Sequence, residues 1–256
     1  KRTLNIAWPS TVEGALTAII GSVDTMMVGT LGAAAIAAVG LTGQPRMIMY
    51  VFAQAMCVGT TALCARRKGA GDQKSANSCL NQSLAIVTVM GILMTLLGYF
   101  GAEWLMKLGG ANEETMALSV AYFRILSFSF LPNCWNMCIC AAMRAIGKTR
   151  ITMITNMTAN LVNVVLNYIL INGKLGFPAL GVRGAALATV LSQAVSAVWV
   201  LRFLTGERTL LRLSWARMRL EPKVILPCLG LGISTFVMVS TESILSVSFT
   251  SSLSRF

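Results

Sequence analysis

Seven stretches of roughly 20 or more mostly apolar residues follow one another along the chain, and each is long enough to cross a bilayer as a helix. They cover residues 5–28, 36–65, 79–101, 118–143, 151–172, 181–204 and 223–249. With 55% apolar and only 12% charged residues, the chain cannot hide its apolar surface as a soluble globule, and the same composition excludes disorder. Since helices and closed barrels are the only backbones that satisfy their hydrogen bonds in lipid, these runs predict an all-α, polytopic membrane protein.

The second stretch is irregular. It begins in the small-residue run Ala33–Gly40 and is interrupted by Gly43-Gln44-Pro45-Arg46, where proline removes a backbone donor. We interpret it as one long, irregular helix. The alternative is a re-entrant piece followed by a shorter helix.

Basic residues gather in every second loop, which is the positive-inside pattern. Three lie in the other loops, Lys107, Lys174 and Arg183, together with Glu103, Glu113 and Glu114. The pattern predicts a cytoplasmic N-terminus. Because the net charge of +12 is divided among short loops, it does not indicate nucleic-acid binding. Fifteen residues make up the cytoplasmic set: Lys1, Arg2, Arg66, Arg67, Lys68, Lys74, Arg144, Lys148, Arg150, Arg202, Arg208, Arg212, Arg217, Arg219 and Lys223.

The composition argues against an enzyme. The chain has no His, so neither a Ser–His–Asp triad nor a His-ligated zinc site can form, and no hydrolase or metal motif is present. The seven Cys lie in or beside apolar stretches, and we interpret them as small packing residues. Cys134, Cys138 and Cys140 do not share one helical face, which argues against a metal cluster. The first stretch is too long for a signal peptide, so we expect none to be cleaved.

Three carboxyl groups lie inside the predicted spans, at Glu13, Asp24 and Glu242. Such groups are costly in hydrocarbon and usually mark function. Glu13 and Asp24 are three helical turns apart and therefore share a face. Two plainer interpretations stay open: Asp24 as an interfacial residue near the outer end of its helix, and Glu13 as a residue that faces water.

Amide and hydroxyl side chains form stripes on the fifth and sixth spans. Four asparagines at spacings of 4, 3 and 4 fall within a stripe about 60° wide, and a second set shares one face of the next span. Such stripes must face other helices or a water-filled cavity. They predict either polar contacts between helices or oxygen ligands in a wet interior, with a second polar cavity at Glu13, Asn156, Asn160 and Gln193. The two stripes are Asn156, Asn160, Asn163 and Asn167, and Thr189, Ser192, Gln193 and Ser196.

Four motifs, in order over about residues 4–200, resemble the multidrug and toxic compound extrusion (MATE) transporters. The first combines Pro9 with an Asp and a Gly-x-x-Gly in one span, and the second and third are basic, glycine-containing turns. The fourth joins the asparagine stripe to a glycine-rich turn. In this sequence they read Val23-Asp24-Thr25-Met26-Met27-Val28-Gly29-Thr30-Leu31-Gly32, Arg67-Lys68-Gly69-Ala70-Gly71-Asp72, Arg144-Ala145-Ile146-Gly147-Lys148-Thr149-Arg150, and Asn163-Val164-Val165-Leu166-Asn167-Tyr168 with Gly176–Thr189.

The resemblance implies a transporter of twelve helices in two lobes, with no cofactor. Residues 1–204 would be the N-terminal six-helix lobe, 205–222 a basic cytoplasmic linker, and 223–256 the start of a C-terminal lobe whose remainder is missing. The family's cation site falls on Asp24, Asn163, Asn167 and Thr189, and its helix-bending proline on Pro9. Some members carry Asp where this chain has Asn167, which leaves H⁺ or Na⁺ open as the coupling ion. The family's functional Glu of helix 7 does not align with Glu242.

The resemblance further implies an antiporter of the inner (plasma) membrane that exports organic, often cationic, compounds in exchange for H⁺ or Na⁺, with small molecules and membrane lipids as its partners. Two alternatives remain. One is a half-transporter or non-transporting lobe that needs a partner. The other is a flippase of lipid-linked precursors from the same superfamily. A flippase would need a strongly cationic cavity, and at most Arg46 and Arg124 are interior basic residues.

Overall fold

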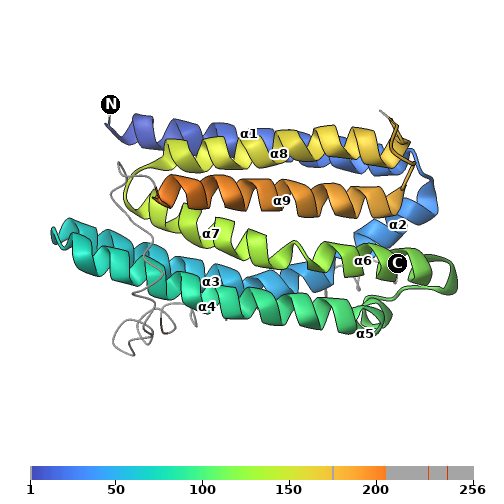
Figure 1. Cartoon of the computed structure of the whole chain (residues 1–256), viewed down its shortest axis with the longest axis horizontal. Helices are drawn as coiled ribbons and strands as arrows, with labels where there is room; N and C mark the ends of the chain where they lie inside the picture. Colours follow the sequence, from blue (N-terminus) through green and yellow to red (C-terminus); the bar gives the residue numbers. More distant parts are fainter. Residues whose placement is uncertain (1, 175, 206–229, 231–240, 242–256) are drawn as a thin grey trace.

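The computed structural model describes residues 2–174 and 176–205, together with residues 230 and 241 (Figure 1). Within that part the chain is helical throughout and forms nine helices. The seventh predicted stretch, Glu242 and the predicted linker beyond Thr205 lie outside the described residues. The helices are α1 (Arg2–Gly29), α2 (Ala33–Leu41), α3 (Gly43–Gly69), α4 (Gln73–Phe100), α5 (Ala102–Leu108), α6 (Glu113–Ser127), α7 (Phe130–Ala145), α8 (Thr149–Asn172) and α9 (Val182–Thr205).

These helices confirm the all-α, polytopic membrane fold and the first six predicted spans. Five segments are long and apolar enough to cross a membrane, and α6 with α7 makes a sixth if that bent pair is one span. Large apolar side chains cover the outside of the bundle, as a lipid environment requires. Leu97, Phe100 and Trp199 are examples, each more than half exposed.

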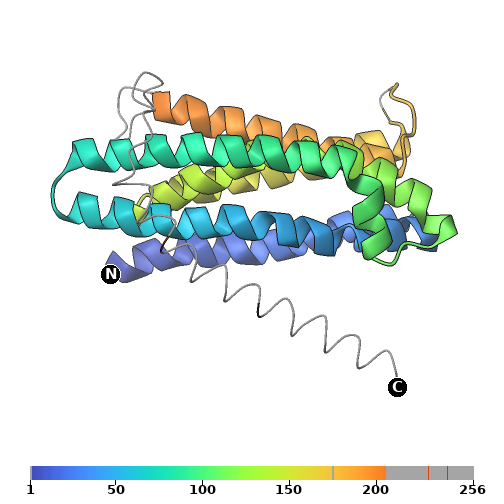
Figure 2. The ribbon, with the colours of Figure 1, turned by 90° about the horizontal axis from the view of Figure 1, so that it is seen from below.

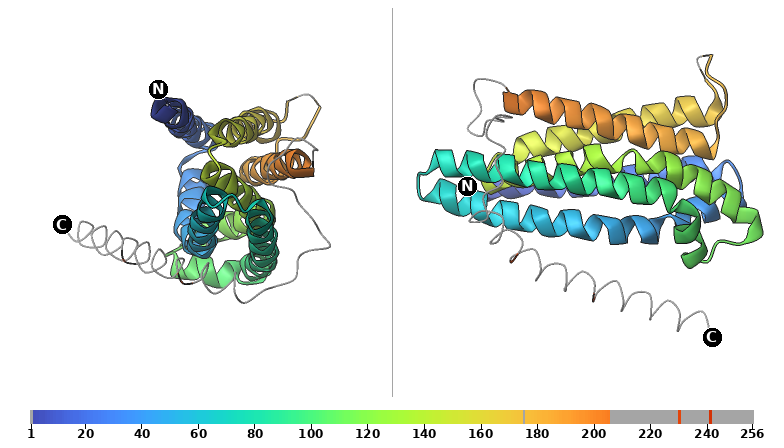
Figure 3. Two further views of the ribbon diagram at one scale, coloured as in Figure 1. Left: turned by 90° about the vertical axis from the view of Figure 1, so that its left-hand side faces the viewer. Right: turned by 60° about the horizontal axis from the view of Figure 1, so that its bottom comes forward.

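The bundle is built around α7, which packs against α3, α4, α8 and α9. Figures 1 and 3 show α3 and α4 on one side of it and α8 and α9 on the other, and Figure 2 views the bundle from the side of α3 and α4. Helix α1 lies at the margin, alongside α8. The inner surfaces are closely packed, and Phe123, Phe130 and Leu80 are fully buried.

The predicted loops alternate between the two ends of the bundle. One end of the bundle holds the start of α1, the α3–α4 turn, the α7–α8 turn and the end of α9 (Figure 1). We call it the basic end. The α1–α2 turn, α5 and the α8–α9 connection lie at the opposite end. All the basic residues of the first two basic loops therefore share one end of the molecule, as the alternating charge pattern predicts.

The second span is one long, irregular helix, as expected. Helices α2 and α3 follow each other with only Thr42 between them and form one apolar stretch of 37 residues. Pro45 lies in the first turn of α3, where a missing N–H does least harm. The Thr42 hydroxyl donates to the Val39 carbonyl at 2.6 Å and so satisfies part of the interrupted backbone.

The fourth span is longer than expected and broken, which the hydropathy pattern did not reveal. Helices α6 and α7 meet at Phe128–Ser129 with a bend of 51°. Pro132 lies in the first turn of α7 and cannot donate back across the break. Ser127 and Ser129 instead donate their hydroxyls to the carbonyls of Phe123 and Leu126, both at 2.7 Å. Such back-bonding bends helices.

The basic turn between α3 and α4 is held by local hydrogen bonds. Gly71 has φ +77°, a left-handed conformation that favours glycine. Asp72 caps α4 by accepting from the Ser75 amide at 3.0 Å, while Arg67 donates to the Ser75 carbonyl at 2.8 Å. The hydroxyl and amide of Ser75 hold the pKa of Asp72 below its ordinary range. The motif that ends in Gly71-Asp72 thus builds a tight, capped turn.

The cysteines pack as predicted. The six in the described residues are free thiols and all are buried: Cys57, Cys64, Cys79, Cys134, Cys138 and Cys140.

Candidate functional site

Helices α1 and α8 run parallel and in register, because three pairs of polar residues exactly 143 positions apart meet between them. Asn156 donates to Glu13 at 2.5 Å, Asn160 to Thr17 at 3.4 Å, and Asn167 to Asp24 at 2.8 Å. We call these three pairs the polar ladder. The asparagine stripe of α8 therefore faces the carboxyl-bearing side of α1, and not lipid.

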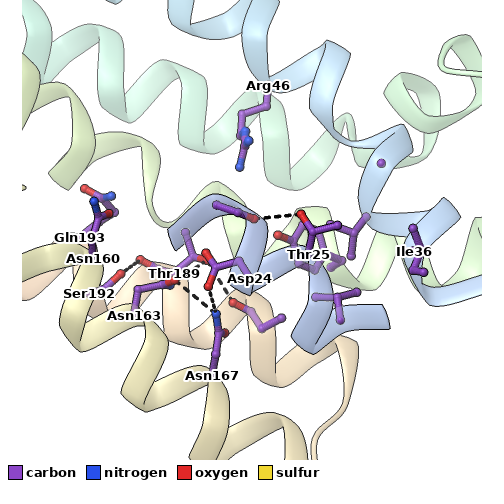
Figure 4. A pocket seen from close by; sticks show the side chains of 16 residues that line it. Asp24, Thr25, Ile36, Arg46, Asn160, Asn163, Asn167, Thr189, Ser192 and Gln193 are labelled. Atoms are coloured by element: carbon purple, nitrogen blue, oxygen red, sulfur yellow. Dashed lines mark hydrogen bonds between the residues drawn. The ribbon is translucent and has the colours of Figure 1, made fainter. Parts of the chain in front are cut away.

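The residues expected at the cation site lie together at the end of the ladder that is farthest from the basic end (Figure 4). Asn167 donates to Oδ1 of Asp24 and, at 3.2 Å, to the Asn163 side-chain oxygen. Asn163 donates to the Thr189 hydroxyl at 3.4 Å, and that hydroxyl donates to the Ala185 carbonyl at 3.1 Å. Asn163 and Asn167 are buried, whereas Asp24 and Thr189 are half-buried. Helices α1, α8 and α9 thus each contribute a side chain to one hydrogen-bonded network.

The Asn163 amide is satisfied when its nitrogen faces the Asp24 carboxylate. In that orientation Asn163 donates to Asp24 Oδ2 at 2.8 Å and to Oδ1 at 3.1 Å. With its oxygen there, two acceptors would face each other. Asn163 and Asn167 therefore both present a nitrogen to Asp24.

A cavity of about 370 Å³ opens beside this network. It is lined by α1, α2, α3, α6, α8 and α9, and its walls include Asp24, Arg46 and Tyr122. Arg46 projects into the cavity from α3, across from Asp24 (Figure 4). Within the described part of the chain, the recorded ion pair joins Arg124 to Glu103 at 2.8 Å, so Arg46 and Asp24 share a cavity without pairing.

A second polar cavity of about 290 Å³ lies toward the basic end, around Glu13. Asn156 accepts there from Asn136 at 3.4 Å while it donates to Glu13. Arg144 lines the same cavity, and Asn160 and Gln193 line both this cavity and the one beside Asp24. Glu13, Asn156, Asn160 and Gln193 thus all line this one cavity.

The sequence analysis missed several contributors to the two cavities. Thr17 completes the middle pair of the ladder, and its position four residues after Glu13 was the available signal. Asn136 and Tyr122 come from α7 and α6, where no polar stripe stands out.

Pro9 lies within α1, which continues through it from Arg2 to Gly29. Glu13 accepts a hydrogen bond and is half-buried, so it does not simply face water.

The oxygen atoms of the site have the chemistry of cation ligands. Carboxylate, amide and hydroxyl oxygens are hard ligands that suit a proton or Na⁺. The Asn167 side-chain oxygen is buried and has no hydrogen-bond partner in the protein, which leaves it available as a ligand. Nothing in the network resembles a nucleophile activated by a base. Together with a polytopic helical bundle, these features define the class of protein as a membrane transporter.

Comparison with known proteins assigns the family. The MatE family model matches residues 9–169. The chain is 30% identical over 197 residues to a probable multidrug resistance protein NorM of Thermotoga maritima, an alignment that covers 77% of this chain and 42% of that protein. It is also similar to two solved structures, described as MATE in the straight and in the bent conformation. Their TM-scores are 0.86 and 0.85, each at 26% identity, covering 95% of this chain and 54% of theirs.

The chain therefore belongs to the MatE (MATE) family of multidrug efflux transporters, as the sequence motifs indicated. This family membership also agrees with the expectation that the protein is not an enzyme. The chain spans about half or less of the length of the curated relatives compared with it, from 36% to 52%.

Proposed function

We propose that this chain forms one lobe of an antiporter that exports organic, often cationic, compounds in exchange for H⁺ or Na⁺, with Asp24 as the ion-coupling carboxyl. The observation that carries the proposal is the contact of Asp24 with two buried amides, Asn167 and Asn163, each with a nitrogen 2.8 Å from a carboxylate oxygen. The name of the Thermotoga maritima relative, a probable multidrug resistance protein, supports export of drug-like molecules.

In the proposed cycle, Asp24 alternates between an ionised and a cation-bound state. In the ionised state the amides of Asn167 and Asn163 donate to it. In the bound state a proton, or Na⁺ held with the oxygens of Asn163, Asn167 and Thr189, neutralises it. Each state favours different contacts between α1, α8 and α9, so occupancy shifts the population of bundle shapes. Pro9 is the place in α1 where a bend costs least hydrogen bonding.

Competition between the coupling ion and the organic cation for one carboxylate would couple the flux of the ion to the export of the cation. An organic cation in the 370 Å³ cavity is favoured by an ionised Asp24 and disfavoured by a neutralised one. Loading the coupling ion therefore releases the cation, and transport requires both states. If Asp24 were held in its ionised state, the cavity would bind the drug but would not release it.

The surroundings proposed for this lobe follow from the family and the charge pattern. We place it in the inner (plasma) membrane among lipids, with the basic end in the cytoplasm, paired with a second lobe. In the described residues, Arg46 is the cation that lines the cavity beside Asp24, and Arg124 instead pairs with Glu103. A single guanidinium facing a carboxylate favours the antiporter over a flippase of lipid-linked phosphates.

The test is Asp24→Asn in cells that lack other pumps. We expect coupled efflux to be lost, while membrane levels stay normal and residual drug binding persists, because asparagine keeps the shape and one acceptor oxygen of the side chain but cannot change charge. Asp72→Asn is the matched control, since it makes the same change at a helix cap where Asn serves as well. Full efflux by Asp24→Asn at matched expression would remove Asp24 from the mechanism and leave it as an interfacial residue.

A further inference from the structure

Glu13, the second carboxyl of α1, lies in a polar environment that ion coupling at Asp24 alone does not require. Glu13 lies eleven residues before Asp24, about 16 Å along the helix, in its own polar cavity of about 290 Å³ nearer the basic end. A carboxyl group this far inside a membrane span is costly and calls for a role.

The two cavities adjoin and are suited to hold water. Asn160 and Gln193 line both of them, so the two cavities meet at a pair of amide side chains. The Gln193 side-chain oxygen is buried and has no protein partner, and the bond from Asn160 to Thr17 is long, at 3.4 Å. A water occupies about 30 Å³ and needs a few polar partners, so each cavity has room for several.

The amide that contacts Glu13 is fixed in its orientation by a second hydrogen bond. Asn156 accepts from Asn136 through its oxygen, so its nitrogen is left to donate to Glu13. Cys140 in turn donates to the Asn136 oxygen at 3.3 Å, which orients that amide as well. Glu13 therefore has a partner that donates a hydrogen bond to the carboxylate.

The charged and titratable groups that face Glu13 come from α7. Arg144 lines the same cavity, and it is exposed at the basic end. The buried Cys140 thiol lies there too and donates to the Asn136 side-chain oxygen. From α8, Glu13 is faced by amides and not by charges. The Arg144 guanidinium lies on the side of this cavity that faces the basic end.

We propose that Glu13 is a second proton-exchanging carboxyl, placed in series between Asp24 and the basic end. A proton leaves the Asp24 carboxyl for water in the adjoining cavities. Water there gives a proton to the Glu13 carboxylate, and Glu13 releases it past Arg144. Each transfer moves one proton between oxygens and involves no redox change. The proposal rests on Asp24 as the coupling carboxyl and adds the route by which its proton leaves.

The test separates the rate of proton release from its extent. Purified protein in lipid nanodiscs is jumped from low to high pH, and a soluble pH-sensitive dye reports the released protons. We expect Glu13→Gln to slow the release from Asp24 at least tenfold without changing the equilibrium proton affinity of Asp24, and Glu13→Asp to restore most of the rate. Asn160→Leu, which puts an apolar side chain between the two cavities, should slow release while leaving Glu13 intact.

Glu103→Gln is the matched control, because it neutralises a carboxyl at the opposite end of the bundle. It should leave the rate unchanged. A wild-type rate in both Glu13→Gln and Asn160→Leu would overturn the series arrangement alone. So would a changed proton affinity of Asp24 in Glu13→Gln, since it would indicate a structural role. An Asp24→Asn variant that releases as many protons as wild type would instead overturn the coupling role of Asp24, and this proposal with it.

Discussion

At the scale of single residues, asparagine carries most of the interior chemistry. Its amide donates through one atom and accepts through the other, so the same side chain can satisfy a carboxylate or a protonated carboxyl. At Asn156 a second partner, Asn136, sets the orientation, and at Asn163 the Asp24 carboxylate does. The orientations at the two ends of the ladder are thus set by these neighbours and not by the asparagines themselves.

Asn167→Ala should tighten proton binding at Asp24. The variant removes a 2.8 Å hydrogen bond to the carboxylate, which is worth about 1.5 kcal/mol when the acceptor is charged and only partly buried. We therefore expect the proton to be held roughly tenfold more tightly and the pH profile of efflux to move to higher pH. Efflux measured across a pH series would show it.

Asn172→Ala is the control for that experiment, because Asn172 bonds only within its own helix, to the Tyr168 carbonyl. Its pH profile should match that of wild type. Identical profiles for Asn167→Ala and wild type would show that this contact does not act on the charge of Asp24.

At the scale of elements, the site depends on how closely α8 and α9 approach. Gly184, in the first turn of α9, faces the α8 backbone so tightly that an added Cβ would lie 2.6 Å from the Leu170 carbonyl oxygen. That approach holds Thr189 within reach of Asn163 at 3.4 Å. Small residues at such crossings are the usual means by which membrane helices pack.

Gly184→Ala should force α9 away from α8. Overpacking of this kind costs about 1–3 kcal/mol, so we expect a lower thermal unfolding midpoint in detergent and a weaker cation affinity. Gly69→Ala is the matched control, since nothing lies within 4 Å of its added Cβ. Equal midpoints for the two variants would mean that the α8–α9 contact tolerates the methyl group.

At the scale of the whole molecule, the ends of the bundle differ in charge, and this asymmetry underlies our proposal for its orientation. The described cysteines are buried, so they should react slowly and leave introduced cysteines readable. Lys74→Cys and Arg150→Cys lie at the basic end, whereas Glu114→Cys and Lys174→Cys lie at the opposite end, and all four positions are exposed. An impermeant thiol reagent should label only the second pair in intact cells. Labelling of the first pair from outside would reverse the orientation.

We also expect residues 1–256 not to transport when reconstituted alone. The curated relatives are about twice as long, and we propose that this lobe pairs with a second one. Helix α1, with Asp24 and Glu13, lies at the margin of this bundle, where a second lobe would complete its surroundings. Ion-coupled drug efflux by proteoliposomes that contain only this chain would contradict the expectation and favour a half-transporter that works by itself or as a dimer.

Hydropathy and helical periodicity alone were enough to predict the first six spans, their alternating basic loops and the polar stripe of α8. These properties are local: a run of apolar residues crosses a bilayer wherever it lies, and residues at spacings of three and four share a face in any helix. The motifs added the family, and with it the grouping of Asp24, Asn163, Asn167 and Thr189. Pro132 was the sequence feature that could have predicted the bend between α6 and α7. The hydrogen bonds of Ser127 and Ser129 at that bend became visible only in the structure.

The tertiary structure alone decided which stripes face each other. Lipid is as apolar as the side chains, so hydrophobicity does not select the partner of a membrane helix, and packing and interhelical hydrogen bonds do. The in-register contact of α1 with α8 made a ladder of three separate pairs, and the approach of α9 at Gly184 brought Thr189 to it. That arrangement placed Asp24 and Glu13 in adjoining cavities, because contacts between residues 143 positions apart depend on the packing of whole helices and not on local sequence.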